Sequence, residues 1–291
     1  MRKLFAIAAL LIIGSDLFSQ VQMKPEETED WSRKPEMVTP GGCNMPPSDA
    51  IILYRSAGDA EKWSDSKGNP IKWKTEDSLT VTPRGGVIQT RQSFGDCQLH
   101  VEWRTPSEVS GSGQGRGNSG VFLMGLYEVQ VLDSWENETY YNGQAGSIYK
   151  QHIPLVNAST PPGTWQTFDI VFTAPRFNED KSLNTPGYIT VFHNGVLIQN
   201  HVELKGPTVF IGKPEYKYHE PKLPLTLQDH TNPVSFRNIW IRNGIMMRQS
   251  RSTRPRLPSW KAASAHSRAS CRPRIRRCNR CSSRRRCTRQ R

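Results

Sequence analysis

The chain has 291 residues, enough for one large β domain or two ordinary domains, and its formal net charge is +13. Residues 246–291 contain fifteen Arg, one Lys and no Asp or Glu, so this tail carries +16 and residues 1–245 carry −3. The basic character that would indicate a nucleic-acid partner therefore belongs to the tail. We predict no nucleic-acid binding by the main part of the chain.

The N-terminus has the pattern of a secretory signal. A basic start, Arg2 and Lys3, precedes an apolar run over Leu4–Gly14 that is too short to anchor the chain in a bilayer. Ser19 is small enough for the position before a cleavage site, so we predict a signal peptide over residues 1–19. A buried core helix is the alternative for this run. After signal removal, the protein would be secreted or periplasmic and would have no membrane segment.

Residues 20–47 are polar and rich in proline, which predicts an extension lying across the surface. The chain up to residue 245 holds two cysteines, Cys43 and Cys97. An oxidising compartment would allow them to pair, but two cysteines carry no spacing information, and two free thiols fit equally well.

From Ala50 onward, short apolar runs are separated by Gly, Pro, Asn and Asp, and only Asp59–Trp63 suggests a short helix. The clearest local signal is Asn194-Gly195 between two apolar runs, because these residues readily adopt the positive φ angles of a type I′ hairpin turn. Many short strands with little helix predict one β-sandwich domain over residues 48–245. The predicted strands are Ile51–Tyr54, Ile71–Thr75, Leu79–Thr82, Val87–Thr90, Cys97–Arg104, Ser119–Met124, Tyr127–Leu132, Gln166–Thr173, Tyr188–His193, Val196–His201, Val209–Gly212, Leu225–Gln228 and Val234–Arg242.

Two of these strands alternate apolar and polar side chains. Glu102 and Arg104 share the polar side of LHVEWR, and Glu128 and Gln130 share the polar side of YEVQV. Because successive side chains of a strand point to opposite faces, each strand would pack one face on the core and leave the other for solvent or a ligand. We interpret the two strands as neighbours that form the floor of a sugar-binding groove.

Other polar residues are candidates for the same groove, each with a structural alternative. Asp133 is either a third carboxylate or metal ligand, or a turn former with Ser134. Glu102 is either catalytic or ion-paired with Arg104. Because a lone histidine is more often structural than catalytic, a structural role is the alternative for His152 and for His230. The remaining candidates are Arg116 and Asn118 in a glycine-rich bend, Trp135 as a stacking surface or an edge cap, Lys150, and Asp229.

Four blocks of sequence resemble one family in a fixed order. They are GQGRGNSGVFLMGLYEVQVLDSW, GSIYKQHIPLVNASTPPGTWQTFDIVFTAPRF, ITVFHNGVLIQNHVELKGPT and PLTLQDHTNPVSFRNIWIR. The chain is similar over about residues 50–242 to the 3-keto-disaccharide hydrolase family, whose members are 3-keto-glucoside lyases and 3-keto-2-hydroxy-glucal hydratases. The resemblance implies a concanavalin-like jelly roll, a β-sandwich of two antiparallel sheets with a face that binds carbohydrate.

The resemblance also implies cleavage of 3-keto-glycosides by elimination across C1–C2 and hydration of the resulting glucal. A ketone at C3 acidifies the C2–H bond, so the reaction needs a base, a group that stabilises the enolate oxygen, and an acid for the leaving group. We assign the proton transfers to Glu102 and Glu128, with Asp133 and His152 as further catalytic candidates. We assign substrate binding to Arg104, Arg116, Asn118, Gln130, Trp135, Lys150, Asp229 and His230.

A divalent metal ion that polarises the keto group would suit this chemistry, and no motif indicates a nucleotide cofactor. Because a fold alone does not fix function, a non-catalytic carbohydrate-binding module is the main alternative, and a conventional glycosidase is a further one.

The tail from residue 246 lies beyond the resemblance. Its composition of Arg, Ser and Cys shows no strand or helix pattern, so a non-native reading frame or a disordered basic tail is expected. A zinc site from Cys271, Cys278, Cys281 and Cys287 is a weaker interpretation, because the spacing contains a single C-x-x-C.

Overall fold

The computed structural model describes residues 24–42 and 45–243. The predicted signal peptide, Cys43 and the tail from residue 246 lie outside the described residues, so the expectations about them stay predictions. Residues 24–42 are almost entirely exposed and contain one 3-10 turn, η1 (Pro25–Glu27).

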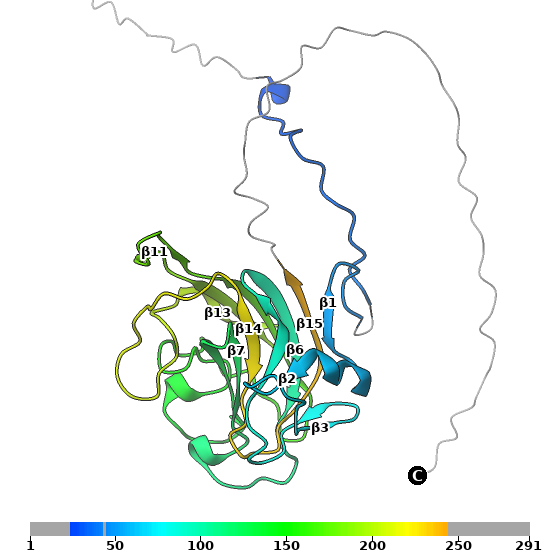
Figure 1. Ribbon diagram of the computed structural model, residues 1–291, viewed down its shortest axis with the longest axis vertical. Helices are drawn as coiled ribbons and strands as arrows, with labels where there is room; N and C mark the ends of the chain where they lie inside the picture. The colour runs from blue at the N-terminus through cyan, green and yellow to red at the C-terminus, as the bar shows by residue number, and fades with distance from the viewer. Residues whose placement is uncertain (1–23, 43–44, 244–291) are drawn as a thin grey trace, which may run out of the picture. The chain divides into compact units, whose positions relative to one another are not determined.

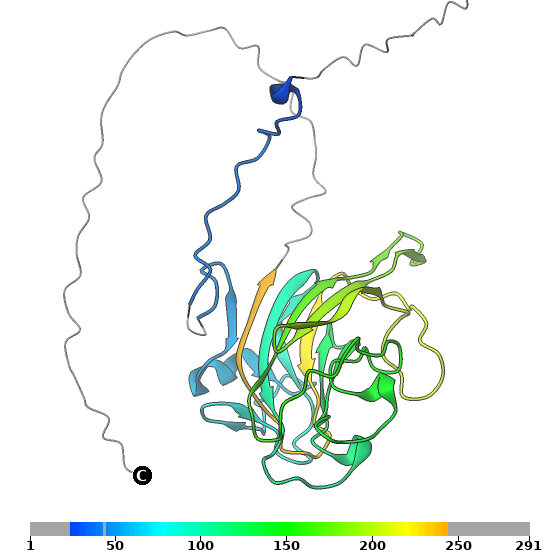
Figure 2. The same cartoon turned by 180° about the vertical axis from the view of Figure 1, so that it is seen from behind.

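Two antiparallel sheets form a β-sandwich (Figures 1 and 2). The larger has eight strands in the order β13-β12-β9-β6-β15-β4-β3, with β1 also paired to β15. The smaller has five strands in the order β2-β5-β14-β7-β8, and β10 and β11 form a separate hairpin. The all-β, two-sheet architecture predicted from the sequence is confirmed.

The eight-stranded sheet contains β1 (Ile51–Tyr54), β3 (Lys74–Thr75), β4 (Leu79–Thr80), β6 (Cys97–Arg104), β9 (Gln166–Thr173), β12 (Tyr188–His193), β13 (Val196–Glu203) and β15 (Ser235–Asn243). The five-stranded sheet contains β2 (Trp63–Ser64), β5 (Ile88–Phe94), β7 (Ser119–Leu123), β8 (Tyr127–Val131) and β14 (Leu223–Leu227). The small hairpin is β10 (Arg176–Phe177) and β11 (Leu183–Thr185), and the remaining 3-10 segments are η2 (Ala57–Lys62), η3 (Gly113–Gly115) and η4 (Tyr141–Gly143).

Most predicted strands are present within a few residues of the expected bounds, but two predictions are wrong. Val209–Gly212 is an irregular loop, and only the last two residues of Ile71–Thr75 are a strand. Apolar residues marked both segments, yet Phe210 and Ile211 are exposed. The apolar run over Val209–Gly212 has no alternation to indicate a strand, whereas Ile71–Thr75 alternates apolar residues with lysines but pairs only through Lys74–Thr75.

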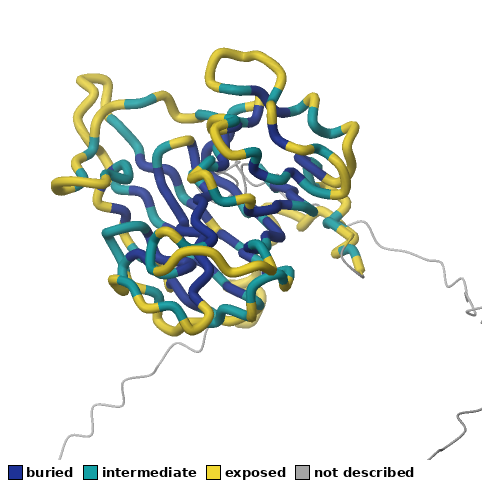
Figure 3. Tube along the Cα trace, turned by 90° about the horizontal axis from the view of Figure 1, so that it is seen from below, coloured by how far each residue is buried: buried dark blue, intermediate teal, exposed yellow. Residues whose placement is uncertain are grey.

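The hydrophobic core lies between the two sheets, and the buried segments in Figure 3 are the strands that enclose it. Trp103 and Phe168 pack at 5.0 Å between ring centroids. Burying a large apolar side chain of this kind contributes roughly 1.5–3 kcal/mol. Cys97 is buried as a free thiol in β6, and its proposed partner Cys43 lies outside the described residues.

The hairpin between β12 and β13 has the predicted turn. Asn194 has φ +51° and Gly195 has φ +78°, so both central residues occupy the left-handed region. Both φ signs match a type I′ turn, whose twist suits the flanking strands.

We expect Gly195→Ala to lower the free energy of unfolding by about 1 kcal/mol, because a Cβ atom is disfavoured at this φ although nothing lies near it. Gly58→Ala is the matched control, since Gly58 has an ordinary φ and its added Cβ meets only Ser56 Oγ, at an ordinary contact distance of 3.9 Å. Urea denaturation of both variants tests the prediction. Equal stability of the two would contradict it.

Candidate active site

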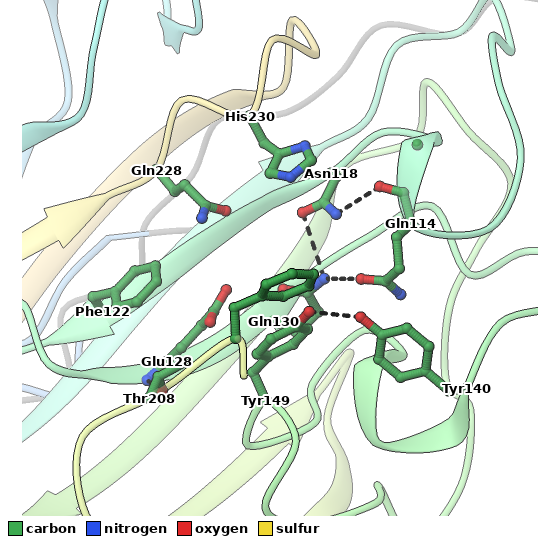
Figure 4. A pocket seen from close by; sticks show the side chains of 12 residues that line it. Gln114, Asn118, Phe122, Glu128, Gln130, Tyr140, Tyr149, Thr208, Gln228 and His230 are labelled. Carbon is green, nitrogen blue, oxygen red and sulfur yellow. Dashed lines mark hydrogen bonds between the residues drawn. The ribbon is translucent and has the colours of Figure 1, made fainter. Parts of the chain in front are cut away.

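A cavity of about 700 Å³ opens on the outer face of the five-stranded sheet (Figure 4). Side chains of β7 and β8 form its floor, and walls come from the segment around η4 and from the loop between β13 and β14. Its size is in the range of small-ligand sites. The lining residues are Gln114, Gly115, Asn118, Phe122, Glu128, Gln130, Tyr140, Tyr149, Thr208, Phe210, Gln228 and His230.

Glu128 lies on the cavity floor, near the start of the edge strand β8. Its neighbours Tyr127 and Val129 are fully buried in the core, so the pleat turns Glu128 to the outer face. A Cβ atom at Gly120 on β7 would lie only 2.6 Å from Glu128 Oε1. The glycine therefore makes room for the carboxyl group. The Glu128 backbone N–H donates to Thr208 Oγ1 at 3.0 Å, which ties the wall to the floor.

The Glu128 carboxyl group has little access to water and no cation to compensate for it. Glu128 is 4% exposed, and no ion pair among the described residues includes it. Burial raises its pKa from 4.5 to about 8, because the ionised form loses hydration. The protonated form of the carboxyl group is therefore favoured at neutral pH. A perturbed acid in a cavity is typical of a functional site.

Three amide side chains extend the floor beside Glu128. Gln130 Nε2 donates to Gln114 Oε1 at 3.1 Å and to Asn118 Oδ1 at 3.4 Å. The same amide turned over donates to Glu128 Oε1 at 2.9 Å. An amide oxygen facing Glu128 suits a protonated carboxyl group, and an amide nitrogen facing it suits a carboxylate. The Gln130 amide therefore lies in hydrogen-bond contact with the Glu128 carboxyl group.

Two tyrosines form one wall of the cavity. The hydroxyl groups of Tyr140 and Tyr149 lie 2.6 Å apart, so one donates to the other and one hydroxyl proton stays available. Burial, followed by the hydrogen bond to Tyr140, raises the pKa of Tyr149, and the charge of nearby Glu128 adds to the shift. Tyr149 therefore stays protonated at neutral pH, and the pair has one hydroxyl proton to donate to a ligand oxygen.

Gln228 and His230 complete the cavity just beyond β14. Gln228 Oε1 is buried and has no hydrogen-bond partner among the described residues, so it can accept a bond from a ligand hydroxyl group. Asp229, between them, accepts bonds from the backbone N–H groups of Gly86 and Thr231 at 2.9 and 2.8 Å. Asp229 therefore fixes the loop that carries the other two residues.

The prediction that Glu102 and Glu128 share a groove is wrong. Their strands, β6 and β8, belong to different sheets, and each side chain lies on the outer face of its own sheet. Glu102 accepts bonds from Arg237 Nε at 2.6 Å and from Asn238 Nδ2 at 2.8 Å. An irregularity of β15 after Arg237 brings both donors to one carboxylate. Glu102 is thus an ion-paired structural residue, and its partner is Arg237 rather than Arg104.

Arg104 lies on that same outer face of the eight-stranded sheet and does not line the cavity. Its guanidinium carbon is 4.7 Å from the centre of the Trp165 ring, and that of Arg237 is 4.0 Å from it. The predicted role of Arg104 in the groove is therefore wrong, because Arg104, like Glu102, lies on β6 of the other sheet.

Asp133 and Arg116 form a buried ion pair beside the cavity. Arg116 Nε donates to Asp133 Oδ2 at 2.7 Å, and Arg116 Nη2 donates to the Trp135 carbonyl oxygen at 2.9 Å. These bonds hold the glycine-rich bend, which carries Asn118, against the segment after β8. Trp135 is 38% exposed and does not line the cavity. Asp133, Arg116 and Trp135 therefore support the site from outside the cavity, whereas Asn118 lines it.

Lys150 and His152 also lie behind the cavity wall. Lys150 Nζ donates to the Phe210 carbonyl oxygen at 2.6 Å. His152 Nε2 is 2.7 Å from the Glu203 carbonyl oxygen, which anchors the loop to β13. His152 does not line the cavity, so the structure gives it no contact with a bound substrate.

The metal prediction has no matching donor set. Within residues 24–42 and 45–243, no three His, Cys, Asp or Glu side chains gather as a metal site. Asp133 and Asp229 are engaged by Arg116 and by backbone N–H groups. We therefore derive no step through a metal ion.

Within residues 24–42 and 45–243, no helix has the length and hydropathy needed to cross a bilayer.

Sequence reasoning identified Asn118, Glu128, Gln130 and His230 among the cavity residues and missed the rest. Phe122 follows Gly120 at a spacing of two on β7, so strand alternation could have found it. Gln114, Tyr140, Tyr149, Thr208, Phe210 and Gln228 come from irregular segments or strand ends, where no periodicity marks them.

The chain is similar to one described family over most of the sandwich. The family profile described as 3-keto-alpha-glucoside-1,2-lyase-like domain matches residues 55–242. A crystal structure from Parabacteroides distasonis ATCC 8503, provisionally described as a glycosyl hydrolase, is 46% identical, with a TM-score of 0.73, and the match covers 77% of this chain and 98% of that chain.

Two more distant structures from Parabacteroides distasonis ATCC 8503 bear the same provisional description. They are 18% and 19% identical, with TM-scores of 0.48 and 0.43; each match covers 67% of this chain, and 94% and 99% of theirs. These likenesses are too weak to carry an argument. A search of curated proteins gives no match.

Glu128 should make the stability of the protein depend on pH. Its pKa is about 8 in the folded state and about 4.5 unfolded, so between these values the folded state binds more protons. The free energy of unfolding should fall as pH rises from about 4.5 to about 8 and then level off.

Glu128→Gln should remove this pH dependence. From pH 5 to pH 8, the free energy of unfolding of the variant should therefore rise by about 2–4 kcal/mol relative to that of the wild type. Urea denaturation of both proteins at several pH values measures the difference, and parallel curves would rule out the raised pKa.

Proposed function

The chain belongs to the 3-keto-alpha-glucoside-1,2-lyase-like family, and on that premise we propose that it cleaves 3-keto-glycosides by elimination followed by hydration. Net hydrolysis then gives a 3-keto-sugar and an alcohol. The observation that carries the proposal is the Glu128 carboxyl group, which is buried in the cavity without a cation and has a pKa near 8.

In the elimination step, ionised Glu128 removes the proton from C2, which the C3 ketone acidifies. The C1–C2 double bond forms as the C1–O bond breaks, and the leaving oxygen takes a proton from the Tyr140–Tyr149 pair. A base with a pKa near the working pH is effective in such transfers. The 2.6 Å contact between the two hydroxyl groups lets the second tyrosine stabilise the one that loses its proton.

In the hydration step, water adds to C1 and returns its proton to the tyrosine pair, while protonated Glu128 gives its proton back to C2. Both groups end in their starting states, and the sum of the two steps is one glycoside plus one water. The cycle uses one carboxyl group, in contrast to the paired carboxyl groups of most glycosidases.

The amide groups supply the polar contacts that the enolate needs. Asn118 Nδ2 donates one N–H bond to the Gln114 carbonyl oxygen at 2.7 Å, so its second N–H bond is left to donate to the oxygen at C3 as negative charge develops there. Gln228 Oε1 can accept a bond from a sugar hydroxyl group. Apart from Glu128, no Asp, Glu, Lys or Arg among the described residues lines the cavity, which fits a neutral sugar.

We expect Glu128→Gln to lower kcat/KM on a 3-keto-glucoside by about 10²–10⁴-fold, because the amide cannot accept the C2 proton. Glu102→Gln is the matched control: Glu102 is an equally buried outer-face glutamate, but it lies outside the cavity. Its activity should stay within about threefold of the wild type, with folding verified by circular dichroism. Release of the leaving alcohol is the measurement.

Three results would decide against the assignment. Equal losses in the two variants would make Glu128 no more important than a structural glutamate. Full activity of Glu128→Gln would remove it from the mechanism. Binding of the 3-keto-glucoside without turnover by the wild type would favour a carbohydrate-binding module.

The pH dependence of kcat/KM should follow the ionisation of Glu128. Since the base must be ionised in the free enzyme, kcat/KM should rise about tenfold per pH unit below pH 8 and level off above it. Tyr149 stays protonated through this range because its pKa is raised. Initial rates between pH 5 and pH 9 test this. A profile that is level from pH 6 would place the essential base elsewhere.

A further inference from the structure

We propose that Phe210 is a specificity-determining residue that packs against an apolar leaving group, and that Lys150 is the positioning residue that holds it. This inference rests on the proposed function and adds the class of glycoside that the site selects.

Phe210 belongs to the loop between β13 and β14, which forms one wall of the cavity. The loop is well anchored up to Thr208, whose backbone N–H donates to the Leu126 carbonyl oxygen at 2.8 Å, and again at Tyr216, whose hydroxyl group donates to the Leu204 carbonyl oxygen at 2.6 Å. Among the described residues, the bond from Lys150 is the one hydrogen bond that fixes residues 209–215. The placement of Phe210 therefore depends on Lys150.

Lys150 makes two kinds of contact with this residue. Its Nζ donates to the Phe210 carbonyl oxygen at 2.6 Å and lies 4.2 Å from the centre of the Phe210 ring. The same Nζ lies 5.6 and 5.7 Å from the ring centres of Tyr140 and Tyr149. One ammonium group thus gathers three aromatic rings of the cavity by cation–π attraction.

The cavity therefore has a polar part and an aromatic part. One part carries Glu128, Gln130 and Asn118, and the other is bounded by Phe210 and the two tyrosines. The keto-sugar must place its C2–H bond at Glu128, so the leaving group extends toward the tyrosine proton donors and the Phe210 ring. Phe210 is 68% exposed, so it has apolar surface left to cover when a ligand binds.

The experiment compares benzyl and methyl 3-keto-α-glucosides. Their leaving alcohols have nearly equal acidity, so a difference in kcat/KM reports contacts with the leaving group and not its chemistry. The wild type should prefer the benzyl compound. Phe210→Ala should reduce the benzyl-to-methyl ratio of kcat/KM by about tenfold, the effect of losing an apolar contact in a pocket.

Three further variants test the arrangement. Ile211→Ala is the matched control, because Ile211 is the next residue, apolar and 84% exposed, and does not line the cavity; it should keep the wild-type ratio. Lys150→Met should reduce the ratio mainly through KM for the benzyl compound. Lys150→Arg should restore most of it, because it keeps a cation and donor at this position.

Calorimetric binding of unreactive benzyl α-glucoside gives a second readout that needs no turnover. Binding should weaken about tenfold in Phe210→Ala and stay unchanged in Ile211→Ala. If the wild type cleaves neither keto-glucoside, the proposed function fails while this binding result still decides the role of Phe210. If Phe210→Ala keeps both the ratio and the binding, or if Ile211→Ala changes them equally, the inference is overturned.

Discussion

The burial of one carboxyl group without a compensating cation is the constraint on which the site depends. Isolating a carboxylate from water is costly, and at Glu128 the protein meets that cost by keeping the group largely protonated. Two features accommodate the group. Gly120 leaves space for the carboxyl group, and Thr208 closes one side.

The contrast between Glu102 and Glu128 shows how environment assigns different roles to similar residues. Both are buried glutamates on the outer face of a sheet. Glu102 has Arg237 and Asn238 as donors, whereas Glu128 faces amides and tyrosines across a cavity. A paired carboxylate stabilises the fold, and an unpaired one beside proton donors can exchange protons with a substrate. Arg116 and Lys150 likewise have a structural role, because their hydrogen bonds hold the cavity walls from outside the cavity.

Much of this arrangement could be predicted from the sequence, and the limits have physical causes. Strand alternation correctly separated the core side of YEVQV from the side that carries Glu128 and Gln130, and Asn194-Gly195 correctly predicted its hairpin. Alternation says nothing about which strands become neighbours, so the pairing of Glu102 with Glu128 was an assumption that sheet topology contradicts. The aromatic wall could not be predicted, since Tyr140, Tyr149 and Phe210 come from irregular segments whose contacts are set by tertiary packing.

The most direct test of this account is a titration of the Glu128 carboxyl group itself. Infrared difference spectroscopy can follow the carbonyl stretch of its protonated form as the pH is raised, with Glu128→Gln identifying the band. We predict that this band disappears with a midpoint near pH 8. A midpoint near pH 4.5 would show that the group is ordinarily hydrated or paired, and would contradict the account.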